Sequence, residues 1–393
     1  MTGTPVRHLF VTQDYPPDLG GMARRHVELC RRLAPDEVRV STVSAPHALA
    51  FDSGEPYPIS RESFSFAQAK VFTNQLRWSR SLVRHLKGPC AIIHLGNVRP
   101  CGYAVQLATR RTPTPYVVYV NGGDLLRERL KTASHAIKRW SARDILGRSA
   151  GIVANSRWTA DVAREVMTLV GVREPPPVAA IDLGTDPKQF TPDKDAGRLR
   201  QRFGIGTAPL LVTVARLVPH KGQDTVIEAM PALGPGTRYL LVGQGPDRAR
   251  LEAMARRLGV ADRVIFAGPL DDGDVAEAYA TATVYVGLSR VDNGVNVEGF
   301  GISFVEASAS GVAVVAGDSG GVRSAVRENE TGFVVPAADP RAAAQAIGSL
   351  LDDEPLRRRL GSGGRRAVEA HYNWDRVARE TRAFVLRVSG YGD

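Results

Sequence analysis

The feature that most restricts the fold is a repeated alternation of short apolar runs with longer amphipathic stretches. An apolar run at His8–Thr12 precedes an amphipathic stretch at Met22–Leu33. Strands that alternate with helices in this way build a parallel sheet with helices on both faces. The pattern predicts an α/β fold with a doubly wound parallel sheet. Further apolar runs in the first half of the chain lie at Val38–Val43, Ala91–His94, Tyr116–Val120 and Gly151–Ala154.

The alternation is interrupted once, which indicates two domains. Glu174-Pro-Pro-Pro177 and a polar stretch at Thr191–Arg198 separate the first series of runs from a second that starts at Leu210–Ala215. A chain of 393 residues also exceeds one ordinary domain of roughly 100–200 residues. We therefore predict two Rossmann-like domains, residues 1–191 and 192–372. The later runs of the second series lie at Tyr239–Gly243, Val264–Ala267, Ala282–Leu288 and Val312–Ala316.

The last part of the chain is predicted to be helical. Residues 365–388 show helical periodicity, which His371-Tyr-Asn-Trp374 interrupts, and Val377, Phe384 and Val388 share one face. We expect residues 373–393 to form a helix that packs back on the first domain. Ligands bind beyond the carboxyl ends of the strands in open parallel sheets, so we expect both domains to face a cleft that holds the site.

Composition excludes several classes of protein. The hydrophobic fraction of 43% and the charged fraction of 23% are those of a globular protein. The three cysteines, Cys30, Cys90 and Cys101, lack disulfide or metal-ligand spacing. No leader or membrane-spanning run is apparent. We expect a cytoplasmic protein without metal or cofactor, and peripheral attachment to the inner face of the membrane stays open.

Positive charge is concentrated in the first half of the chain. Residues 61–157 contain seventeen Lys or Arg and four Asp or Glu, a net +13, whereas the whole chain carries +10. Such a region suggests an anionic partner: a membrane surface, an acidic acceptor or a nucleic acid. Composition alone does not choose among them.

Two glutamates eight residues apart mark the strongest candidate site. Glu298 precedes Phe300-Gly301-Ile302, and Glu306 lies in the helix that this turn opens. A helix start presents free backbone N–H groups and a positive dipole end, which suit a phosphate or a developing leaving-group charge. Most glutamates are solvated surface residues. The preceding strand and the apolar neighbours favour a ligand-binding loop here.

Two cations follow a predicted strand of the second domain. Arg216 and Lys221 stand on the loop after Leu210–Ala215. A guanidinium fork and an ammonium point charge can together hold a diphosphate. Gly243, at the end of the next strand, permits a close approach of backbone to ligand. Each signal is weak by itself, and their shared position at strand ends gives them weight.

Gly20 and Gly21 join the first strand to the first helix. Paired glycines permit a positive φ and let a phosphate or sugar lie against the backbone, and a plain turn is the competing interpretation. The segment is not a GxGxxG fingerprint, and the chain has no Walker P-loop. The usual signatures of hydride transfer and phosphoryl transfer are therefore lacking.

These motifs, in this order, resemble those of the retaining GT-B glycosyltransferases of family 4, and particularly the bacterial phosphatidylinositol mannosyltransferase branch. The resemblance covers nearly the whole chain. It implies a metal-independent hexosyltransferase that uses a nucleotide-diphosphate sugar, with GDP-mannose favoured over a UDP-sugar, and a lipid-linked or glycan acceptor. The motifs are Pro16-Pro17…Gly20-Gly21, Asn155-Ser156, Leu183-Gly184-Thr-Asp186…Phe190, Arg216…Lys221-Gly222, Gly243…Gly245-Pro246 and Glu298…Glu306.

The resemblance also implies roles for individual residues. Arg216 and Lys221 hold the donor diphosphate, Glu306 accepts hydrogen bonds from the ribose, and Glu298 orients sugar hydroxyls. The backbone of Phe300-Gly301-Ile302 grips the transferred sugar. Two fixed cations and helix dipoles can stabilise a departing nucleoside diphosphate as Mg²⁺ does elsewhere. In the same way Gly20 and Gly21 lie against the phosphates, and Gly243 belongs to the donor site.

Two positions depart from the family pattern. Asn121 stands where the family usually has a histidine, which affects the hydrogen bond to the donor sugar. An amide can still donate and accept. Gly320-Gly321-Val-Arg323-Ser324 lacks the carboxylate of the usual Gly-Gly-x-Pro-Glu. Neither change removes a leaving-group contact, so we expect an active enzyme in which Asn121 alters sugar preference.

Four cations recur at helical spacing within the basic region: Arg77, Arg80, Arg84 and Lys87. Leu126, Leu130, Ala133, Ile137 and Trp140 form an apolar stripe beside further cations. Charge runs are usually solvated faces and apolar stripes are usually core. Binding of the four cations to anionic lipid is the alternative, and it would bring a lipid acceptor to the first domain.

Two other functions stay open at this stage. One is a catalytically weak nucleotide-sugar or polyanion-binding protein, suggested by Asn121 and the basic region. The other is a nucleotide-sugar epimerase on the same fold, which the pair Glu298 and Glu306 disfavours. Nucleic-acid binding has no recognition motif or aromatic platform in this sequence, so no nucleic-acid partner is expected.

Overall fold

The computed structural model describes residues 7–17, 20–87 and 92–391. Three parts of the sequence analysis lie outside the described residues. They are Cys90, Ala91 of the predicted strand Ala91–His94, and positions 18 and 19 of the first glycine loop. The chain forms two compact units. Unit 1 comprises Met1–Ile181 and Trp374–Asp393, and unit 2 comprises Asp182–Asn373. The segment 182–191, which the sequence assigned to the first domain, belongs to unit 2.

Unit 1 contains a sheet that, over the described residues, has seven parallel strands in the order β3-β2-β1-β4-β5-β6-β7. The central strands are continuous apolar runs; β5 (Tyr116–Val120), for example, is buried at every position. Strands covered on both faces need such sequences. The other strands are β1 (His8–Val11), β2 (Val38–Ser44), β3 (Ile59–Ser65), β4 (Ile92–Leu95), β6 (Gly151–Ala154) and β7 (Val178–Ala180).

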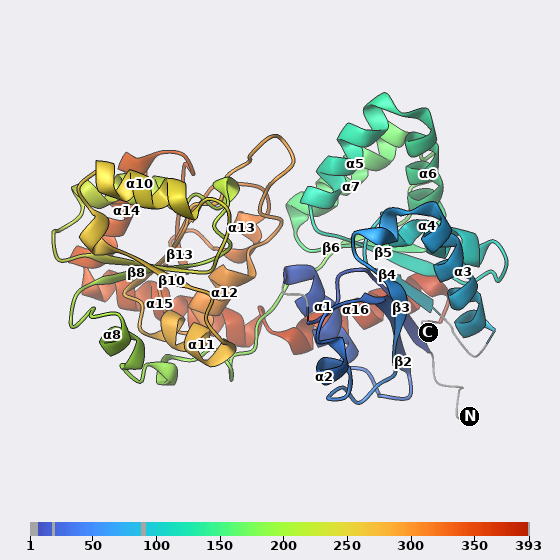
Figure 1. The fold of residues 1–393 in the computed structure, drawn as a ribbon, viewed down its shortest axis with the longest axis horizontal. Coiled ribbons are helices and arrows are strands. Elements are labelled where there is room, and N and C mark those ends of the chain that lie inside the picture. The colour runs from blue at the N-terminus through green and yellow to red at the C-terminus, as the bar shows by residue number, and fades with distance from the viewer. Residues whose placement is uncertain (1–6, 18–19, 88–91, 392–393) are drawn as a thin grey trace. The chain divides into compact units, whose positions relative to one another are not determined.

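Helices cover both faces of this sheet (Figure 1). One face carries α1 (Gly21–Cys30), α2 (Ala48–Asp52) and α16 (Trp374–Ser389). Helix α16 packs against α1 and β6 and buries Val377 and Phe384, so both ends of the chain build unit 1. The other face carries α3 (Phe72–Leu86), α4 (Cys101–Thr109), α5 (Gly123–Ser134), α6 (Ala136–Gly147) and α7 (Arg157–Val170), and a 3₁₀ turn η1 (Gln68–Lys70) precedes α3.

Unit 2 repeats this architecture with six described parallel strands in the order β10-β9-β8-β11-β12-β13. Its core is apolar; Leu211, Tyr239 and Val286, from three neighbouring strands, are fully buried. The strands are β8 (Leu210–Val214), β9 (Arg238–Val242), β10 (Val264–Gly268), β11 (Val284–Gly287), β12 (Val314–Gly317) and β13 (Gly332–Val335).

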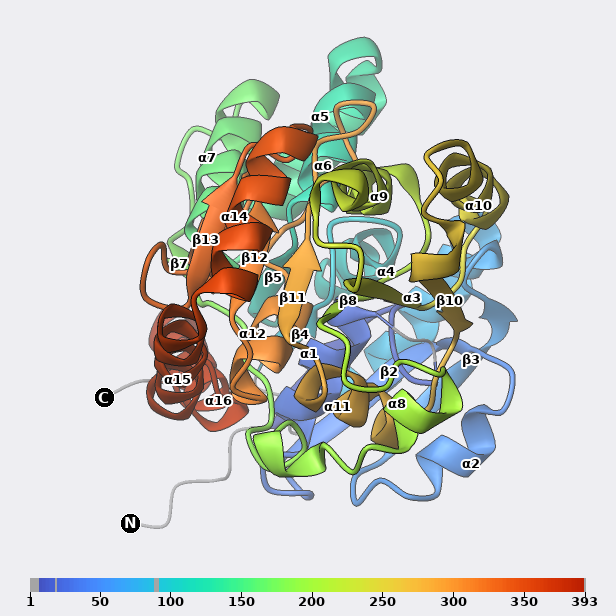
Figure 2. The same cartoon turned by 90° about the vertical axis from the view of Figure 1, so that its left-hand side faces the viewer.

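The helices of unit 2 also form two layers, as Figure 2 shows. One layer contains α9 (Gln223–Ala229), α10 (Arg248–Arg257) and α14 (Pro340–Asp352). The other contains α8 (Arg198–Arg202), α11 (Asp272–Ala280), α12 (Ile302–Ala309) and α15 (Glu354–Ala370). The short elements are α13 (Val322–Ala325) and the 3₁₀ turns η2 (Pro192–Lys194), η3 (Pro219–Lys221), η4 (Met230–Ala232) and η5 (Ala261–Arg263).

The strands that the sequence pattern missed are β3, β7 and β13, and all three are edge strands. An edge strand is only partly covered, so it needs no continuous apolar run. The residues of the apolar stripe, 126–140, are divided between two helices, because α5 ends at Ser134 and α6 begins at Ala136. Within the described residues, no helix combines the length and apolar character needed to cross a membrane.

Candidate functional site

The strand order of unit 2 reverses between β8 and β11, and the candidate residues gather beyond these two strands. In a doubly wound sheet the loops after such a pair of strands lead to opposite faces and leave a crevice at the carboxyl edge. Arg216 and Lys221 follow β8, and Glu298 follows β11. The topology therefore brings the cations and the first glutamate to one edge of the sheet.

An ion pair joins the two loops. Lys221 Nζ lies 2.5 Å from Glu298 Oε2, and the two side chains are only 21% and 15% exposed. Ser289, just beyond β11, places its hydroxyl 3.5 Å from the same carboxylate oxygen. The ammonium is thus held at the carboxyl edge of the sheet by a half-buried carboxylate, in a position from which it can also meet an anionic ligand.

Arg216 differs from Lys221 because its side chain is exposed. Its guanidinium has no hydrogen-bond or ion-pair partner within the part of the chain that the structure describes. Its backbone is fixed, since its carbonyl oxygen accepts a 2.9 Å hydrogen bond from Gln223 Nε2. Burial and the neighbouring Lys221 lower the pKa of His220. The loop therefore presents a fixed backbone, a neutral imidazole and a guanidinium free to bind an anion.

Two glycines allow the close packing of this edge. A Cβ on Gly243, where φ is 128°, would lie 2.2 Å from the carbonyl oxygen of Ala215. Gly301, the N-cap of α12, has a φ of 97°, and a Cβ there would lie 2.3 Å from the Phe304 ring. Only glycine fits both positions without a shift of the chain. Phe300 is buried beside Gly301, and Ile302 is the first residue of α12.

Glu306 lies in the second turn of α12 and is partly exposed. The Tyr279 hydroxyl donates a 2.7 Å hydrogen bond to Glu306 Oε2. Burial, reinforced by Glu306, raises the pKa of Tyr279 well above its ordinary value, so this hydroxyl stays a donor. The bond fixes the orientation of this carboxylate on α12.

In unit 1 the strand order reverses between β1 and β4, and a polar cluster follows these strands. Gln13 and Asn97 each donate a 3.0 Å hydrogen bond to Asp14 Oδ2. Gly20 precedes α1 and Gly21 begins it. Gly20 does not use the positive φ that glycine permits: its φ is 168°, which is extended backbone, and a Cβ would meet nothing within 4 Å.

Asn121 stands at the carboxyl end of β5, before α5. Its backbone N–H donates a 3.0 Å hydrogen bond to Asp124 Oδ1, which fixes the loop. Its side-chain Nδ2 is buried and has no hydrogen-bond partner within the described chain. A buried amide donor without a partner is costly, so this atom is a candidate for contact with a ligand.

The described residues contain no candidate metal centre. Across the described ranges, no three His, Cys, Asp or Glu side chains are grouped so that they could hold a metal ion. The carboxylates of the candidate site are instead paired with a cation and a hydroxyl, Glu298 with Lys221 and Glu306 with Tyr279.

Comparison with known proteins assigns the chain to a family. The family models "Glycosyltransferase Family 4" and "Glycosyl transferases group 1" match residues 19–178 and 195–367. The GDP-mannose-dependent alpha-(1-6)-phosphatidylinositol monomannoside mannosyltransferase of Mycobacterium tuberculosis is 31% identical over 392 residues, which is 96% of this chain and 98% of that protein. The chain is a glycosyltransferase of family 4.

A further relative and two solved structures extend this glycosyltransferase comparison. The GDP-mannose-dependent monoacylated alpha-(1-6)-phosphatidylinositol monomannoside mannosyltransferase of Corynebacterium glutamicum is 29% identical, covering 93% of this chain and 94% of that one. HepE of Anabaena, in complex with UDP and glucose, has a TM-score of 0.78 at 19% identity, with 96% and 98% of the chains covered. Sucrose-phosphate synthase of Thermosynechococcus elongatus has a TM-score of 0.78 at 22% identity, with coverage of 98% and 99%. The fold is therefore GT-B.

The structure adds residues to the candidate site that the sequence did not single out. Ser289 and Tyr279 contact Glu298 and Glu306, and Asp14 with Asn97 occupies the equivalent edge of unit 1. Ser289 and Asn97 each lie two residues past the carboxyl end of a strand. This position is the sequence signal that could have identified them as candidate site residues. Tyr279 lies on α11, far from any motif, and only the tertiary fold brings it to Glu306.

Proposed function

We propose that this glycosyltransferase transfers mannose from GDP-mannose to a phosphatidylinositol-type lipid acceptor, with retention at the anomeric carbon. The observation that carries the proposal is the group formed by Arg216, Lys221 and Glu298 at the strand reversal of unit 2. The names of the full-length relatives supply the sugar and the acceptor class. Unit 2 then holds the donor and unit 1 the acceptor.

The donor contacts follow from the charges on unit 2. Arg216 offers a planar fork and Lys221 a point charge, and together they can neutralise the diphosphate without a metal ion. The backbone N–H groups at the start of α12 add a positive dipole end. Glu306, fixed by Tyr279, accepts from the ribose hydroxyls, and Glu298 accepts from hydroxyls of the sugar. Gly243 and Phe300-Gly301-Ile302 provide backbone in contact with the donor.

In the proposed reaction, the bond between the anomeric carbon and the diphosphate oxygen breaks with both electrons passing to the diphosphate. An acceptor hydroxyl oxygen forms its new bond to the same face of that carbon. The hydroxyl proton passes to the departing phosphate oxygen, so no enzyme nucleophile is needed and configuration is retained. Arg216 and Lys221 stabilise the growing charge on the leaving group, which is where preorganised cations contribute most.

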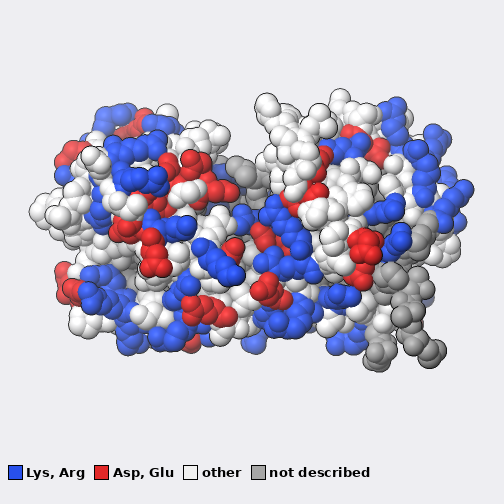
Figure 3. All heavy atoms as spheres, turned by 90° about the horizontal axis from the view of Figure 1, so that it is seen from below, with Lys and Arg blue, Asp and Glu red and all other residues white. Residues whose placement is uncertain are grey.

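The acceptor side of the proposal involves a membrane. Arg77, Arg80, Arg84 and Lys87 are all exposed along α3 and its C-cap, whereas Trp78 and Leu82 on the opposite side are buried. Figure 3 shows Lys and Arg side chains along the edge of unit 1 where α3 lies in Figure 1. Leu130, Ile137 and Trp140, near the α5–α6 turn, are 58%, 82% and 46% exposed. Exposed cations and exposed apolar groups on one unit are both features that favour binding to an anionic lipid surface.

The test is a transfer assay with purified enzyme, phosphatidylinositol monomannoside vesicles and a panel of GDP- and UDP-sugars. We expect GDP-mannose to give a mannosylated lipid with an α-linkage, and the rate to persist in EDTA. Transfer from a UDP-sugar and not from GDP-mannose would show that the proposed donor is wrong. A β-linked product would contradict the retaining mechanism. Loss in EDTA that Mg²⁺ or Mn²⁺ restores would contradict charge neutralisation by Arg216 and Lys221.

A further inference from the structure

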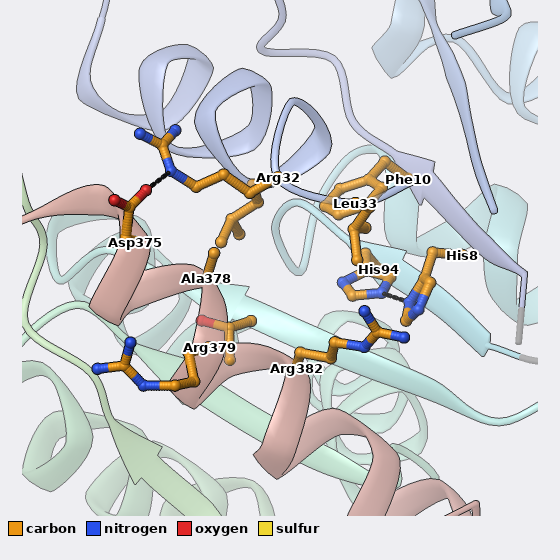
Figure 4. Close-up of a pocket in the computed structure, with 11 residues that line it drawn as sticks. His8, Phe10, Arg32, Leu33, His94, Asp375, Ala378, Arg379 and Arg382 are labelled. Carbon is orange, nitrogen blue, oxygen red and sulfur yellow. Dashed lines mark hydrogen bonds and ion pairs between the residues drawn. The ribbon is translucent and has the colours of Figure 1, made fainter. Parts of the chain in front are cut away.

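A cavity of about 410 Å³ lies within unit 1, under α1 and α16 on one face of the sheet (Figure 4). It is lined from the sheet by His8 and Phe10 of β1 and by His94 of β4. None of the candidate site residues lines it. Cavities of this size commonly hold small organic molecules.

The cavity has an apolar floor and two polar ends. Phe10, Leu29 and Leu33 contribute the apolar surface. At one end Arg32 is already satisfied, because its guanidinium donates 2.6 Å hydrogen bonds to Asp375 Oδ1 and to Glu28 Oε2. Two carboxylates already pair the charge of Arg32, so that end offers little to an anion.

The other polar end has unused hydrogen-bonding capacity. His8 is 1% exposed, and its Nε2 is buried without a hydrogen-bond partner in the described chain. Its other nitrogen, Nδ1, lies 2.9 Å from His94 Nε2. Burial, followed by the nearby Arg382, lowers the pKa of His8 to about 4. The ring is therefore neutral near pH 7 and has one nitrogen for a ligand.

Arg382 brings a positive charge to the same end. Figure 4 shows its side chain extending from α16 towards His8 and His94, whereas Arg379 points away. Arg382 Nη2 lies 3.5 Å from Glu37 Oε2. This separation exceeds the 2.7–2.9 Å that is usual for a hydrogen bond between charged groups. A guanidinium has five donors, so Arg382 can keep this contact and still bind an anion.

We propose that this cavity binds a small amphipathic anion. Its carboxylate or phosphate accepts hydrogen bonds from Arg382 and from His8 Nε2, and its apolar body lies on Phe10, Leu29 and Leu33. The anion supplies the partner that the buried His8 nitrogen lacks. It also adds a second negative group beside Arg382, whose ion-pair partner among the described residues is Glu37 at 3.5 Å.

The bound anion sets the direction of a buried hydrogen-bond chain. His94 Nε2 contacts His8, and His94 Nδ1 lies 2.7 Å from the Tyr119 hydroxyl. Burial lowers the pKa of His94 well below its ordinary value, so each imidazole carries a single N–H. When His8 Nε2 donates to the anion, His8 Nδ1 must accept from His94, and His94 Nδ1 must accept from Tyr119. The anion therefore fixes the tautomers of two histidines.

The test uses calorimetry on the full chain with four probes: octanoate, octyl phosphate, octanol and inorganic phosphate. We expect one saturable site for the octyl anions, and the tighter of the two identifies the anionic group. Octanol and inorganic phosphate should each bind at least tenfold more weakly. Arg382→Gln should weaken the binding of both octyl anions at least tenfold. The matched control is Arg387→Gln, which removes an exposed charge from the same helix outside the cavity and should bind them like the parent.

A second measurement follows the tautomer directly. In ¹⁵N-histidine-labelled protein, the octyl anion should move the His8 ring to the Nε2–H form, with His8→Gln used to assign the signal. The proposal is overturned if octanol binds as tightly as the anions, if Arg382→Gln and Arg387→Gln bind alike, if no probe saturates, or if the His8 ring nitrogens do not respond.

Discussion

Lys221 Nζ lies 2.5 Å from Glu298 Oε2, so the cation after β8 is paired before any ligand arrives. A diphosphate that binds Lys221 must share this ammonium with Glu298. The carboxylate holds the lysine in place, but it also repels an approaching phosphate once the lysine is gone. The affinity for the donor therefore depends on the negative charge of Glu298.

Lys221→Met should weaken nucleoside-diphosphate binding by about 2–5 kcal/mol, the cost of breaking a desolvated charge contact. Part of this loss comes from the unneutralised Glu298, so the double variant Lys221→Met/Glu298→Gln should bind more tightly than Lys221→Met alone. Calorimetry with GDP measures both. Arg248→Gln, an exposed cation of α10, is the control and should bind like the parent. Equal affinities for the single and double variants would show that the ion pair is not coupled to the donor.

Arg216→Gln should lower kcat more than it lowers GDP affinity, because its exposed guanidinium is positioned to meet charge that grows on the leaving group. Since the side chain has no partner in the described residues, thermal stability should stay within about 0.5 kcal/mol of the parent. Steady-state kinetics and thermal unfolding supply the two readings. A large loss of stability, or an unchanged kcat, would contradict this role.

Asn121→His should change the relative kcat/KM among donor sugars on one base and leave GDP affinity nearly intact. The buried Nδ2 atom has no partner in the described chain, and an amide positions hydroxyls without taking up a proton near neutral pH. The assay compares several GDP-sugars with both proteins. If the ratio among sugars is unaltered, or if diphosphate affinity collapses, Asn121 does not contact the sugar.

Reversal of Arg77, Arg80, Arg84 and Lys87 to Glu should abolish co-sedimentation with anionic vesicles. Each cation near an anionic surface contributes about 1 kcal/mol, and salt screens the attraction. The control reverses four exposed arginines of unit 2, namely Arg256, Arg257, Arg358 and Arg359, which changes the net charge equally. If both variants lose vesicle binding equally, or if the parent binds neutral and anionic vesicles equally well, the α3 surface does not mediate membrane binding.

Acid should destabilise unit 1 between pH 6.5 and about 4. Burial lowers the pKa of His8 to about 4 and, together with Arg25, that of His26 to about 3. In this window the unfolded chain binds protons that the folded chain does not, so the free energy of unfolding falls as pH falls, by at most about 1.4 kcal/mol per pH unit for each histidine.

Tryptophan fluorescence during urea unfolding can follow this loss in unit 1 alone. All four tryptophans of the chain belong to unit 1: Trp78, Trp140, Trp158 and Trp374. His26→Leu removes one titrating group, and its stability should therefore depend less steeply on pH than that of the parent. Parallel pH profiles for the two proteins would contradict the assignment of His26 as a buried neutral ring.

The sequence predicted the buried strands and the strand-end motifs because both leave a local signal. β5 is a continuous apolar run, and Arg216 and Lys221 stand directly after another. The edge strand β3 is half-exposed, and its sequence does not separate it from a loop. The contact between Tyr279 and Glu306 depends on how α11 packs beside α12, which no spacing in the sequence encodes.

Gly20 shows a different limit. A Gly-Gly pair is compatible with a positive φ, but it does not require one, and the structure has extended backbone there. By contrast, Gly301 does adopt the left-handed region, and the Phe304 ring also occupies the space where a side chain would stand. The residue type alone therefore did not distinguish the two glycines.

The assembly of unit 1 from two distant segments has a consequence for biosynthesis. Residues 182–373 form unit 2 without interruption, whereas unit 1 needs Trp374–Asp393 in addition to its first 181 residues. A nascent chain leaves the ribosome in sequence order, so the surface that receives Val377 and Phe384 stays open while all of unit 2 is translated. Unit 1 is thus begun before unit 2 but completed after it. A chaperone that shields this apolar surface would act during that interval.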